Sequence, residues 1–211
     1  MMILRNNMEF RKFKEKVKNM PFFSSDVAEI FSTSPLTLRN QFSRWKKLGL
    51  LQELKRGLYI LGQGERQTAI SRQAIAAILY QPSYISLESA LSHYQMIPER
   101  VDAVMSVSPK KTRMFHNSLG TFHYRNLQTS LNFGFMAKKD ENGYPYFIAE
   151  PEKALLDYLY LNLGGLDPKD GDILDRSIRL QNRSILNKNK LFSYARRFDV
   201  KKLHAILKEL K

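Results

Sequence analysis

The segment from Pro35 to Leu48 brings together side chains that bind nucleic-acid bases and phosphates. Arg makes two hydrogen bonds to guanine, Asn makes two to adenine, and the hydroxyls of Ser and Thr bind either bases or phosphates. The residues of these types in this segment, together with one lysine, are Thr37, Arg39, Asn40, Ser43, Arg44 and Lys47. This set predicts contacts to the bases and backbone of double-stranded DNA.

A stripe of apolar residues indicates that the segment is a helix with its polar residues on the other face. The stripe recurs at intervals of three and four residues and consists of Leu38, Phe42, Trp45 and Leu48. When such a helix enters the major groove, its N-terminal part reaches the bases. We therefore assign base contacts to Thr37, Arg39 and Asn40. Arg44 and Lys47 are assigned to phosphates, which position the protein without specifying sequence.

The residues around this helix predict a complete winged helix-turn-helix over residues 1–62. Ser34 is the expected N-cap, Pro35 the first helical residue and Gly49 the left-handed residue after the end. A short helix is expected before it at Ser25–Phe31, and an earlier one at Glu9–Lys18. Two strands, Leu50–Leu54 and Leu58–Leu61, flank a basic turn that forms the expected wing. The further DNA-contacting residues predicted from this arrangement are Ser34, Lys55 and Arg56.

Two other interpretations of this segment stay open. One is a small helical domain whose basic face is only solvated. The other is a winged helix used for docking to a protein.

The charge of the chain is unevenly distributed. The 211 residues carry a formal net charge of +14. Residues 1–62 hold 12 Lys/Arg and 5 Asp/Glu, a net +7; residues 63–175 hold 11 and 13, a net −2; and residues 176–211 hold 11 and 2, a net +9. Clustered basic charge is typical of proteins that bind nucleic acid or another polyanion.

The composition excludes several classes of function. The absence of cysteine excludes disulfides, thiol catalysis and cysteine-based metal sites. The longest apolar run, Ala74–Tyr80, is too short for a membrane helix, and the first residues lack the apolar region of a signal peptide. We therefore expect a cytoplasmic protein.

Residues 63–211 are predicted to form a second domain. Because helices and a sheet are expected in both domains, the sequence predicts a chain of the α+β class. Helices are expected before and after a small, antiparallel sheet, and the C-terminal tail is expected to be helical. The five predicted strands are Val101–Val107, Thr112–His116, Thr121–Arg125, Phe133–Lys138 and Tyr144–Ala149. Asp157 is expected on a polar helix face, paired with a basic residue of the tail.

No motif in the chain predicts catalysis, a metal site or a cofactor. The four histidines, among which His116 and His123 flank one predicted hairpin, lack a third ligand of known proximity. The Asp-x-Lys pair at Asp167 and Lys169 lies in a loop and not on the strand that a nuclease needs. The glycine pairs Gly62-x-Gly64 and Gly164-Gly165 lack the spacing of a phosphate-binding loop. We expect a protein that is not an enzyme.

Two stretches of the predicted second domain resemble a known family. They are YISLESALSHYQMIPE, from Tyr84 to Glu99, and IAEPEKALLDYLYL, from Ile148 to Leu161. Together with KRGLYIL at the close of the wing, they are similar to the AbiEi-type antitoxins of type IV toxin–antitoxin systems, which are also transcriptional regulators. The resemblance implies a winged helix that binds inverted repeats in the promoter of its own operon. It also implies a C-terminal domain that supports cooperative binding and neutralises a nucleotidyltransferase-like toxin.

The basic tail is the expected surface for that toxin. Its basic residues include Arg176, Arg179, Arg183, Lys188, Lys190, Arg196, Arg197, Lys201 and Lys202. We assign toxin binding to Arg196, Arg197, Lys201 and Lys202, with a second DNA contact or a solvated helical face as alternatives. Two further functions stay open for the whole chain: a regulator whose second domain binds a small molecule, and an enzyme fused to a DNA-binding module.

Overall fold

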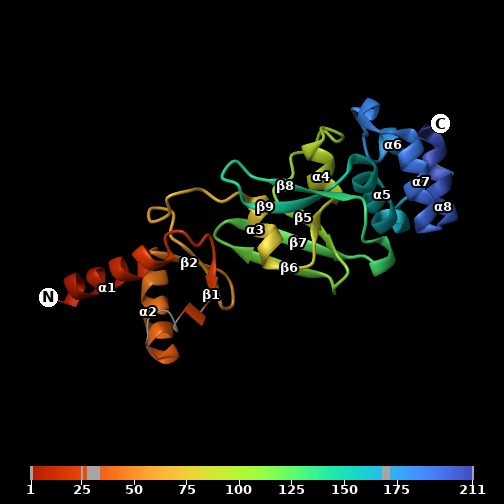
Figure 1. The fold of residues 1–211 in the computed structure, drawn as a ribbon. Coiled ribbons are helices and arrows are strands. Elements are labelled where there is room, and N and C mark those ends of the chain that lie inside the picture. The colour runs from red at the N-terminus through yellow and green to blue at the C-terminus, as the bar shows by residue number, and fades with distance from the viewer. Residues whose placement is uncertain (1, 25, 28–33, 168–171, 211) are drawn as a thin grey trace. The chain divides into compact units, whose positions relative to one another are not determined.

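The computed structural model of the chain describes residues 2–24, 26–27, 34–167 and 172–210 (Figure 1). Contacts divide the chain into two compact units. The first unit is Met1–Ile70 with His116–Leu119, and the second is Ser71–Phe115 with Gly120–Lys211. The sequence pattern divides the chain after residue 62, and the contacts divide it after Ile70. Both units combine helices with a sheet, so the α+β class is confirmed.

The described residues of the first unit include two long helices and a three-stranded antiparallel sheet. Its elements are α1 (Met2–Val17), β1 (Phe23–Ser24), α2 (Pro35–Lys47), β2 (Leu51–Lys55) and β3 (Leu58–Leu61). The strand order is β1-β3-β2, and Tyr59 of β3 is paired with both Phe23 and Glu53. The short helix predicted at Ser25–Phe31 falls mostly on residues 25 and 28–33, which lie outside the described residues.

Aromatic side chains from α1, β1, α2 and β3 meet in the core of the first unit, and β2 adds Leu51. Phe13 of α1 contacts Trp45 of α2, with ring centroids 4.9 Å apart, and Phe23 of β1, at 5.4 Å. Phe42 of α2 meets Tyr59 of β3 edge-on at 4.9 Å. Such aromatic pairs contribute about 0.5–1.5 kcal/mol each beyond the area that they bury. They fix α2 against α1 and the sheet.

One residue of the predicted apolar stripe is not in this core. Leu38, Phe42 and Trp45 are each 2% exposed, whereas Leu48 is 60% exposed. The prediction for Leu48 is wrong because α2 ends at Lys47 and Leu48 takes the C-cap position, with φ −86° and ψ 0°.

The second unit is built on a six-stranded sheet with the strand order β6-β7-β5-β4-β9-β8. The strands are β4 (Tyr84–Ile85), β5 (Val104–Ser108), β6 (Arg113–Asn117), β7 (Gly120–Asn126), β8 (Phe135–Lys139) and β9 (Pro145–Ala149). The expectation of an antiparallel sheet is wrong. The pairs β4–β9 and β5–β7 are parallel, while β4–β5 and β8–β9 are antiparallel, so the sheet is mixed.

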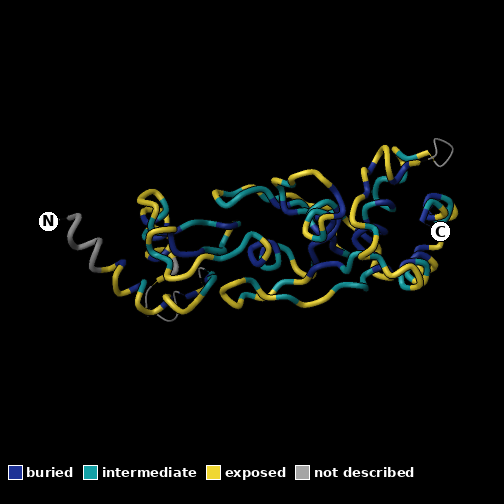
Figure 2. Tube along the Cα trace, turned by 90° about the horizontal axis from the view of Figure 1, so that it is seen from above, coloured by how far each residue is buried: buried dark blue, intermediate teal, exposed yellow. Residues whose placement is uncertain are grey.

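Helices pack against this sheet and against one another to complete the core of the second unit. They are α3 (Arg72–Leu79), α4 (Leu87–His93), α5 (Pro151–Asn162), α6 (Ile173–Arg176), α7 (Lys188–Phe198) and α8 (Lys201–Ile206), with short 3₁₀ turns at Thr129–Leu131, Leu163–Gly165, Arg183–Ile185 and Leu207–Leu210. Helix α5 packs against α4 and α7, and its Leu155, Leu156 and Leu159 have no exposed surface. In Figure 2 the buried residues form the dark-blue stretches inside each unit, and exposed residues, in yellow, lie on turns and on the outer faces of helices.

A buried ionic network lies in the core of the second unit. Lys153 forms an ion pair with Asp157, one turn later on α5, and neither side chain is exposed. Lys153 Nζ also donates to the Tyr84 hydroxyl (2.8 Å). Asp157 accepts hydrogen bonds from Tyr84 (2.9 Å) and Ser86 (2.8 Å). Asp157 is therefore paired within its own helix, and not with the tail as expected.

The pKa values of the pair follow from its burial. Burial lowers the pKa of Lys153 and raises that of Asp157, and the charge of each residue opposes the shift in the other. The Lys153 ammonium also lies 5.2 Å from the ring centroids of Tyr84, Phe133 and Phe198. These faces are electron-rich and favour a cation. The hydrogen bonds and the aromatic rings thus compensate in part for the hydration that the two charges lose on burial.

Candidate nucleic-acid interface

The start of α2 is fixed by its predicted N-cap. The Oγ atom of Ser34 accepts a hydrogen bond from the backbone N–H of Thr37 at 3.2 Å, which satisfies one of the unpaired donors at the helix end. The Ser34 and Thr37 hydroxyls are also within 2.8 Å of each other. A hydroxyl has one donor and two acceptor positions, so each retains some capacity for a ligand. Both residues are exposed but already engaged with each other.

The end of α2 is fixed by the predicted glycine. Gly49 has φ +72°, its N–H donates to the Lys46 carbonyl (3.0 Å), and the N–H of Leu50 donates to the Trp45 carbonyl (2.9 Å). These two bonds form a Schellman motif, which satisfies carbonyls left free at a helix end. The motif turns the chain directly from α2 into β2. It thereby sets where the predicted wing begins.

The polar face of α2 is turned to solvent. Its six predicted residues are all exposed: Thr37, Arg39, Asn40, Ser43, Arg44 and Lys47. Within the described part of the chain, the side chains of Arg39, Asn40, Ser43 and Lys47 have no hydrogen-bond or ion-pair partner. The opposite face is anchored by Leu38, Phe42 and Trp45. The exposed face of α2 therefore presents two cationic side chains and two neutral hydrogen-bonding side chains that are available to bind a ligand.

Leu36 is a further candidate that the sequence pattern did not single out. It lies in the first turn of α2 and is 65% exposed. It shares a helix face with Asn40 and Ser43, four and seven residues later. An apolar side chain in this position matches the methyl group of thymine in the major groove. The sequence could have indicated this exposure, because Leu36 does not belong to the apolar stripe that begins at Leu38.

The predicted wing is the turn between β2 and β3. Arg56 is exposed at this turn, Lys55 is half-buried, and Gly57 has φ +80°. The neighbouring Lys46 has a different role, because it forms an ion pair with Glu53 of β2 and lies 5.9 Å from the Tyr59 ring centroid. The hydrogen bond that Lys46 donates to Glu53 raises the pKa of Lys46, although burial opposes this shift. Lys46 joins α2 to the sheet, while Arg56 extends from it.

The four predicted toxin-binding residues differ in their surroundings. Arg197 lies 3.4 Å from the Phe133 ring centroid and donates to the Ser130 carbonyl at 3.3 Å. Lys202 donates to the carbonyl of Leu163, the C-cap residue of α5, at 2.6 Å. Arg196 and Lys201 are exposed and have no partner among the described residues. Of the four predicted residues, these two therefore remain available for a partner as far as the described residues show.

Other basic residues of the tail are paired with carboxylates. Arg179 lies 3.4 Å from Glu99, Arg176 lies 3.8 Å from Asp172, and Arg183 forms an ion pair with Asp175. The excess positive charge at the surface of the tail is therefore smaller than the sequence count indicates.

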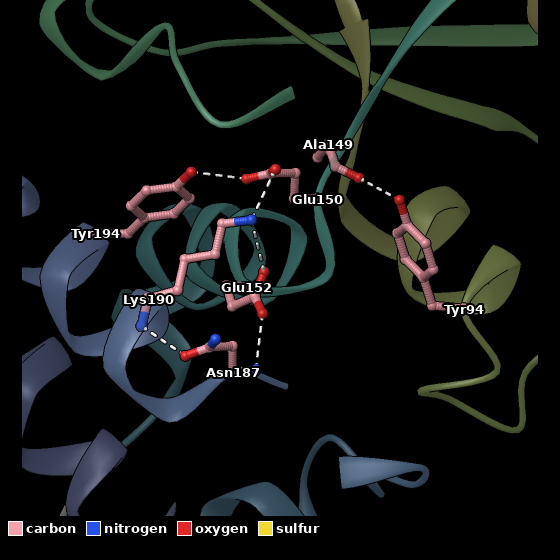
Figure 3. A network of polar contacts seen from close by, with 7 residues as sticks. All are labelled: Tyr94, Ala149, Glu150, Glu152, Asn187, Lys190 and Tyr194. Carbon is pink, nitrogen blue, oxygen red and sulfur yellow. Dashed lines mark hydrogen bonds and ion pairs between the residues drawn. The ribbon is translucent and has the colours of Figure 1, made fainter. Parts of the chain in front are cut away.

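Lys190 of α7 belongs to a network at the start of α5 (Figure 3). Its Nζ lies 2.7 Å from Glu150, which also accepts a hydrogen bond from the Tyr194 hydroxyl at 2.7 Å. Glu152 accepts from the backbone N–H of Asn187 at 2.8 Å. Burial alone raises the pKa of Glu150, but the hydrogen bonds from Lys190 and Tyr194 and the charge of Lys190 together lower it. The network ties α7 to α5.

The remaining sequence patterns concern metal binding, nuclease chemistry and membrane insertion. No three His, Cys, Asp or Glu side chains gather as a metal site among the residues that the structure describes. Asp167 is exposed, and Lys169 lies outside the described residues. In the same part of the chain, every helix is too short or too polar to cross a bilayer.

Comparison with known proteins gives no assignment for this chain. No family model matches it, and no curated protein matches it.

Proposed function

We propose that this protein is a sequence-specific DNA-binding transcriptional regulator that uses its first unit as a winged helix-turn-helix. The observation that carries the proposal is the solvent-facing side of α2. Arg39, Asn40, Ser43 and Lys47 stand there unpaired within the described chain, above a buried aromatic anchor. These are the side chains that read base edges and bind phosphates.

The dimensions of the element suit the proposed ligand. An α-helix fits the major groove of B-DNA, and its first turns reach the base edges. Leu36, Arg39 and Asn40 occupy these first turns, and Lys47 lies in the last turn, where it meets a phosphate. Arg56 at the turn between β2 and β3 contacts the neighbouring phosphates or the minor groove. The net charge of +7 over residues 1–62 supplies affinity through release of counterions.

We further propose that the protein represses its own operon and acts as the antitoxin of a type IV toxin–antitoxin pair. This part rests on the resemblance of Tyr84–Glu99 and Ile148–Leu161 to the AbiEi-type family. In the structure these two stretches are neighbours, because Ile85 pairs with Ile148 between β4 and β9. The buried network of Tyr84, Ser86, Lys153 and Asp157 also joins them. The stretches that carry the resemblance thus form one structural centre of the second unit.

In this proposal the protein acts in the cytoplasm by binding and not by catalysis. Two copies on an inverted repeat cover the promoter, and the second unit holds a nucleotidyltransferase-like toxin. The recognition helix must stay free for DNA, so the toxin needs a different surface. The exposed Arg196 and Lys201 are the residues that we assign first to that surface.

Selection of bound fragments from a random DNA pool tests the proposal directly. The full chain is expected to enrich one inverted-repeat sequence, and the Arg39→Ala/Asn40→Ala double variant is expected to lose that enrichment. The matched control is Lys139→Ala/Lys208→Ala, which removes two exposed charges of the second unit. Failure of the wild-type chain to enrich any sequence contradicts the assignment.

A further inference from the structure

The second unit contains a cavity of about 580 Å³ that the proposed DNA and toxin surfaces do not use. It is lined by Ala77 of α3, the loop that enters β4, the first residue of β8 and the first three residues of β9. The residues that define its walls are Pro82, Tyr84, Asn132, Phe135, Tyr146 and Phe147. Its volume lies within the range of about 300–1,000 Å³ that is typical of small-molecule sites.

Six of the ten residues that line the cavity are aromatic residues or prolines. The rings of Tyr84 and Phe135 are stacked, with centroids 4.7 Å apart and planes 19° apart. Phe147 meets Phe135 edge-on at 5.5 Å and is 47% exposed. A flat ring that enters the cavity therefore finds both ring edges and ring faces, the two geometries in which aromatic groups attract one another.

The deep wall of the cavity is held in place from behind. Tyr84 is 2% exposed, and its hydroxyl is fixed by Lys153 Nζ at 2.8 Å and by Asp157 Oδ2 at 2.9 Å. Both of these groups lie on α5, in the centre of the unit. A wall that is ordered before binding does not lose that freedom when a ligand arrives. The cavity is thus preformed and does not have to be opened by its ligand.

The lining residues carry no ionisable acidic or basic group except the tyrosine hydroxyls. None of the ten is Asp, Glu, Lys, Arg or His. Burying a charged group without a partner costs several kcal/mol, so a charged ligand is disfavoured. The side chains of Gln81, Ser83 and Asn132 line the same cavity and make no hydrogen bond within the described chain. They offer donors and acceptors to a polar substituent on an otherwise apolar ligand.

From this geometry we infer that the cavity is a binding site for a neutral, planar aromatic small molecule that carries hydrogen-bonding groups. The ligand's ring system lies against Phe135 and Phe147, and the stacked Tyr84 ring supports Phe135. Its polar substituent faces Gln81, Ser83 or Asn132. The inference does not rest on DNA binding and adds a third kind of partner to the protein.

Titration of the full chain with the neutral dye N-phenyl-1-naphthylamine tests the site. Its fluorescence is expected to rise and saturate at one dye per chain. Phe147→Ala removes an exposed wall without disturbing the core, and it is expected to weaken binding about 3- to 10-fold, the effect of one lost aromatic contact. Ala77→Trp fills the cavity from α3 and is expected to abolish binding. Met136→Ala, on β8 but outside the lining, is the matched control and is expected to bind like the wild type.

A second dye tests the ligand class. The anionic analogue 8-anilinonaphthalene-1-sulfonate carries the same rings with a sulfonate, and it is expected to bind at least 10-fold more weakly. Equal affinity for the two dyes overturns the assignment to neutral ligands. Fluorescence that rises without saturation, or that is the same for wild type and Phe147→Ala, overturns the site itself. Circular dichroism shows whether each variant is folded, and Phe147→Ala carries the test if Ala77→Trp does not fold. A negative result here leaves the DNA selection experiment unaffected.

Discussion

Lys153 and Asp157 stand one helical turn apart on α5 and form an ion pair in which neither side chain is exposed. Their remaining polar contacts are to Tyr84 and Ser86, from the strand and helix cap on the other side of the core. The pair therefore links the N-terminal half of α5 to β4.

Removal of one partner of this pair is expected to be strongly destabilising. Lys153→Met leaves a buried carboxylate without its cation, and such changes cost about 3–5 kcal/mol. The double variant Lys153→Met/Asp157→Leu removes both charges and is expected to recover part of that loss. Chemical denaturation followed by circular dichroism measures the free energy of unfolding. Lys139→Met, at an exposed position, is the control and is expected to change it by less than about 0.5 kcal/mol.

Trp45 provides an internal check on that result. It is the only tryptophan of the chain and is buried in the first unit. Its fluorescence reports the first unit separately from the second. A loss of stability in Lys153→Met that appears only in the Trp45 signal contradicts our account of the pair.

Acid is expected to weaken the joint between α5 and α7. The pKa of Glu150 is lowered in the folded state by Lys190 and Tyr194, against the effect of burial. A lowered pKa means that the stabilisation is complete above the unfolded value of about 4.5 and is lost as the pH falls through the folded value. Wild type and Glu150→Gln should therefore differ in unfolding free energy at pH 7, and the difference should shrink towards pH 3. The exposed Glu141→Gln is the control, and a constant difference for Glu150→Gln would be inconsistent with this linkage.

Substitutions on α2 are expected to separate sequence recognition from general affinity. Arg39→Ala or Asn40→Ala should each lose roughly 1–3 kcal/mol at one base position, because a base contact is specific. Lys47→Ala should weaken binding to all sequences about equally, because a phosphate contact is not. Binding to the selected operator and to scrambled DNA at fixed salt measures the ratio. If both base-contact variants keep the wild-type ratio, α2 does not enter the groove in the proposed orientation.

The turn between β2 and β3 is expected to contribute to the salt dependence of binding. Replacement of Lys55 and Arg56 by Ala should reduce the slope of log K against log salt concentration by about one for each lost phosphate contact. The measurement is a set of titrations at several salt concentrations. Lys139→Ala/Lys208→Ala removes the same charge elsewhere and should leave the slope unchanged. Equal slopes for the Lys55/Arg56 variant and the wild type would mean that this turn points away from DNA.

The basic tail is expected to contain two kinds of positions. Arg196→Glu/Lys201→Glu changes exposed, unpartnered charges and should abolish protection from the proposed toxin without loss of stability. Arg197→Ala and Lys202→Ala break contacts to Ser130 and Leu163, and should lower the unfolding free energy by about 1 kcal/mol or more. Co-expression of full-length variants with the adjacent toxin gene, scored by growth, measures protection. Undiminished protection by the Arg196/Lys201 variant removes the toxin surface from these helices.

Local sequence signals were sufficient for α2 and its ends. Ser34 caps the helix and Gly49 ends it, as the sequence predicts, because both effects act within one turn of the chain. The strands of the two sheets other than β1 and β4 were also predictable within a few residues, since each shows its own pattern. Strands β1 (Phe23–Ser24) and β4 (Tyr84–Ile85) were missed because two residues show no periodicity.

Pairing between distant strands had no such local signal. Hairpins such as β8–β9 follow from a short turn, but the parallel pairs β4–β9 and β5–β7 join segments that are far apart in the sequence. The antiparallel sheet expected from the hairpins was therefore wrong in its centre. The cavity beside Tyr84 was equally absent from the sequence, because its walls come from α3, β4, β8 and β9.

The sequence by itself determined the polar and apolar faces of α2, because helical spacing alone decides which side chains share a face. Only the tertiary structure decided the environment of Lys153 and Asp157. Their spacing of four residues is the same as that of many exposed ion pairs on helices. They are buried because Tyr84, Phe133 and Phe198, from three distant parts of the chain, close around them. Burial depends on which segments pack against a helix, and the sequence of the helix alone does not specify those segments.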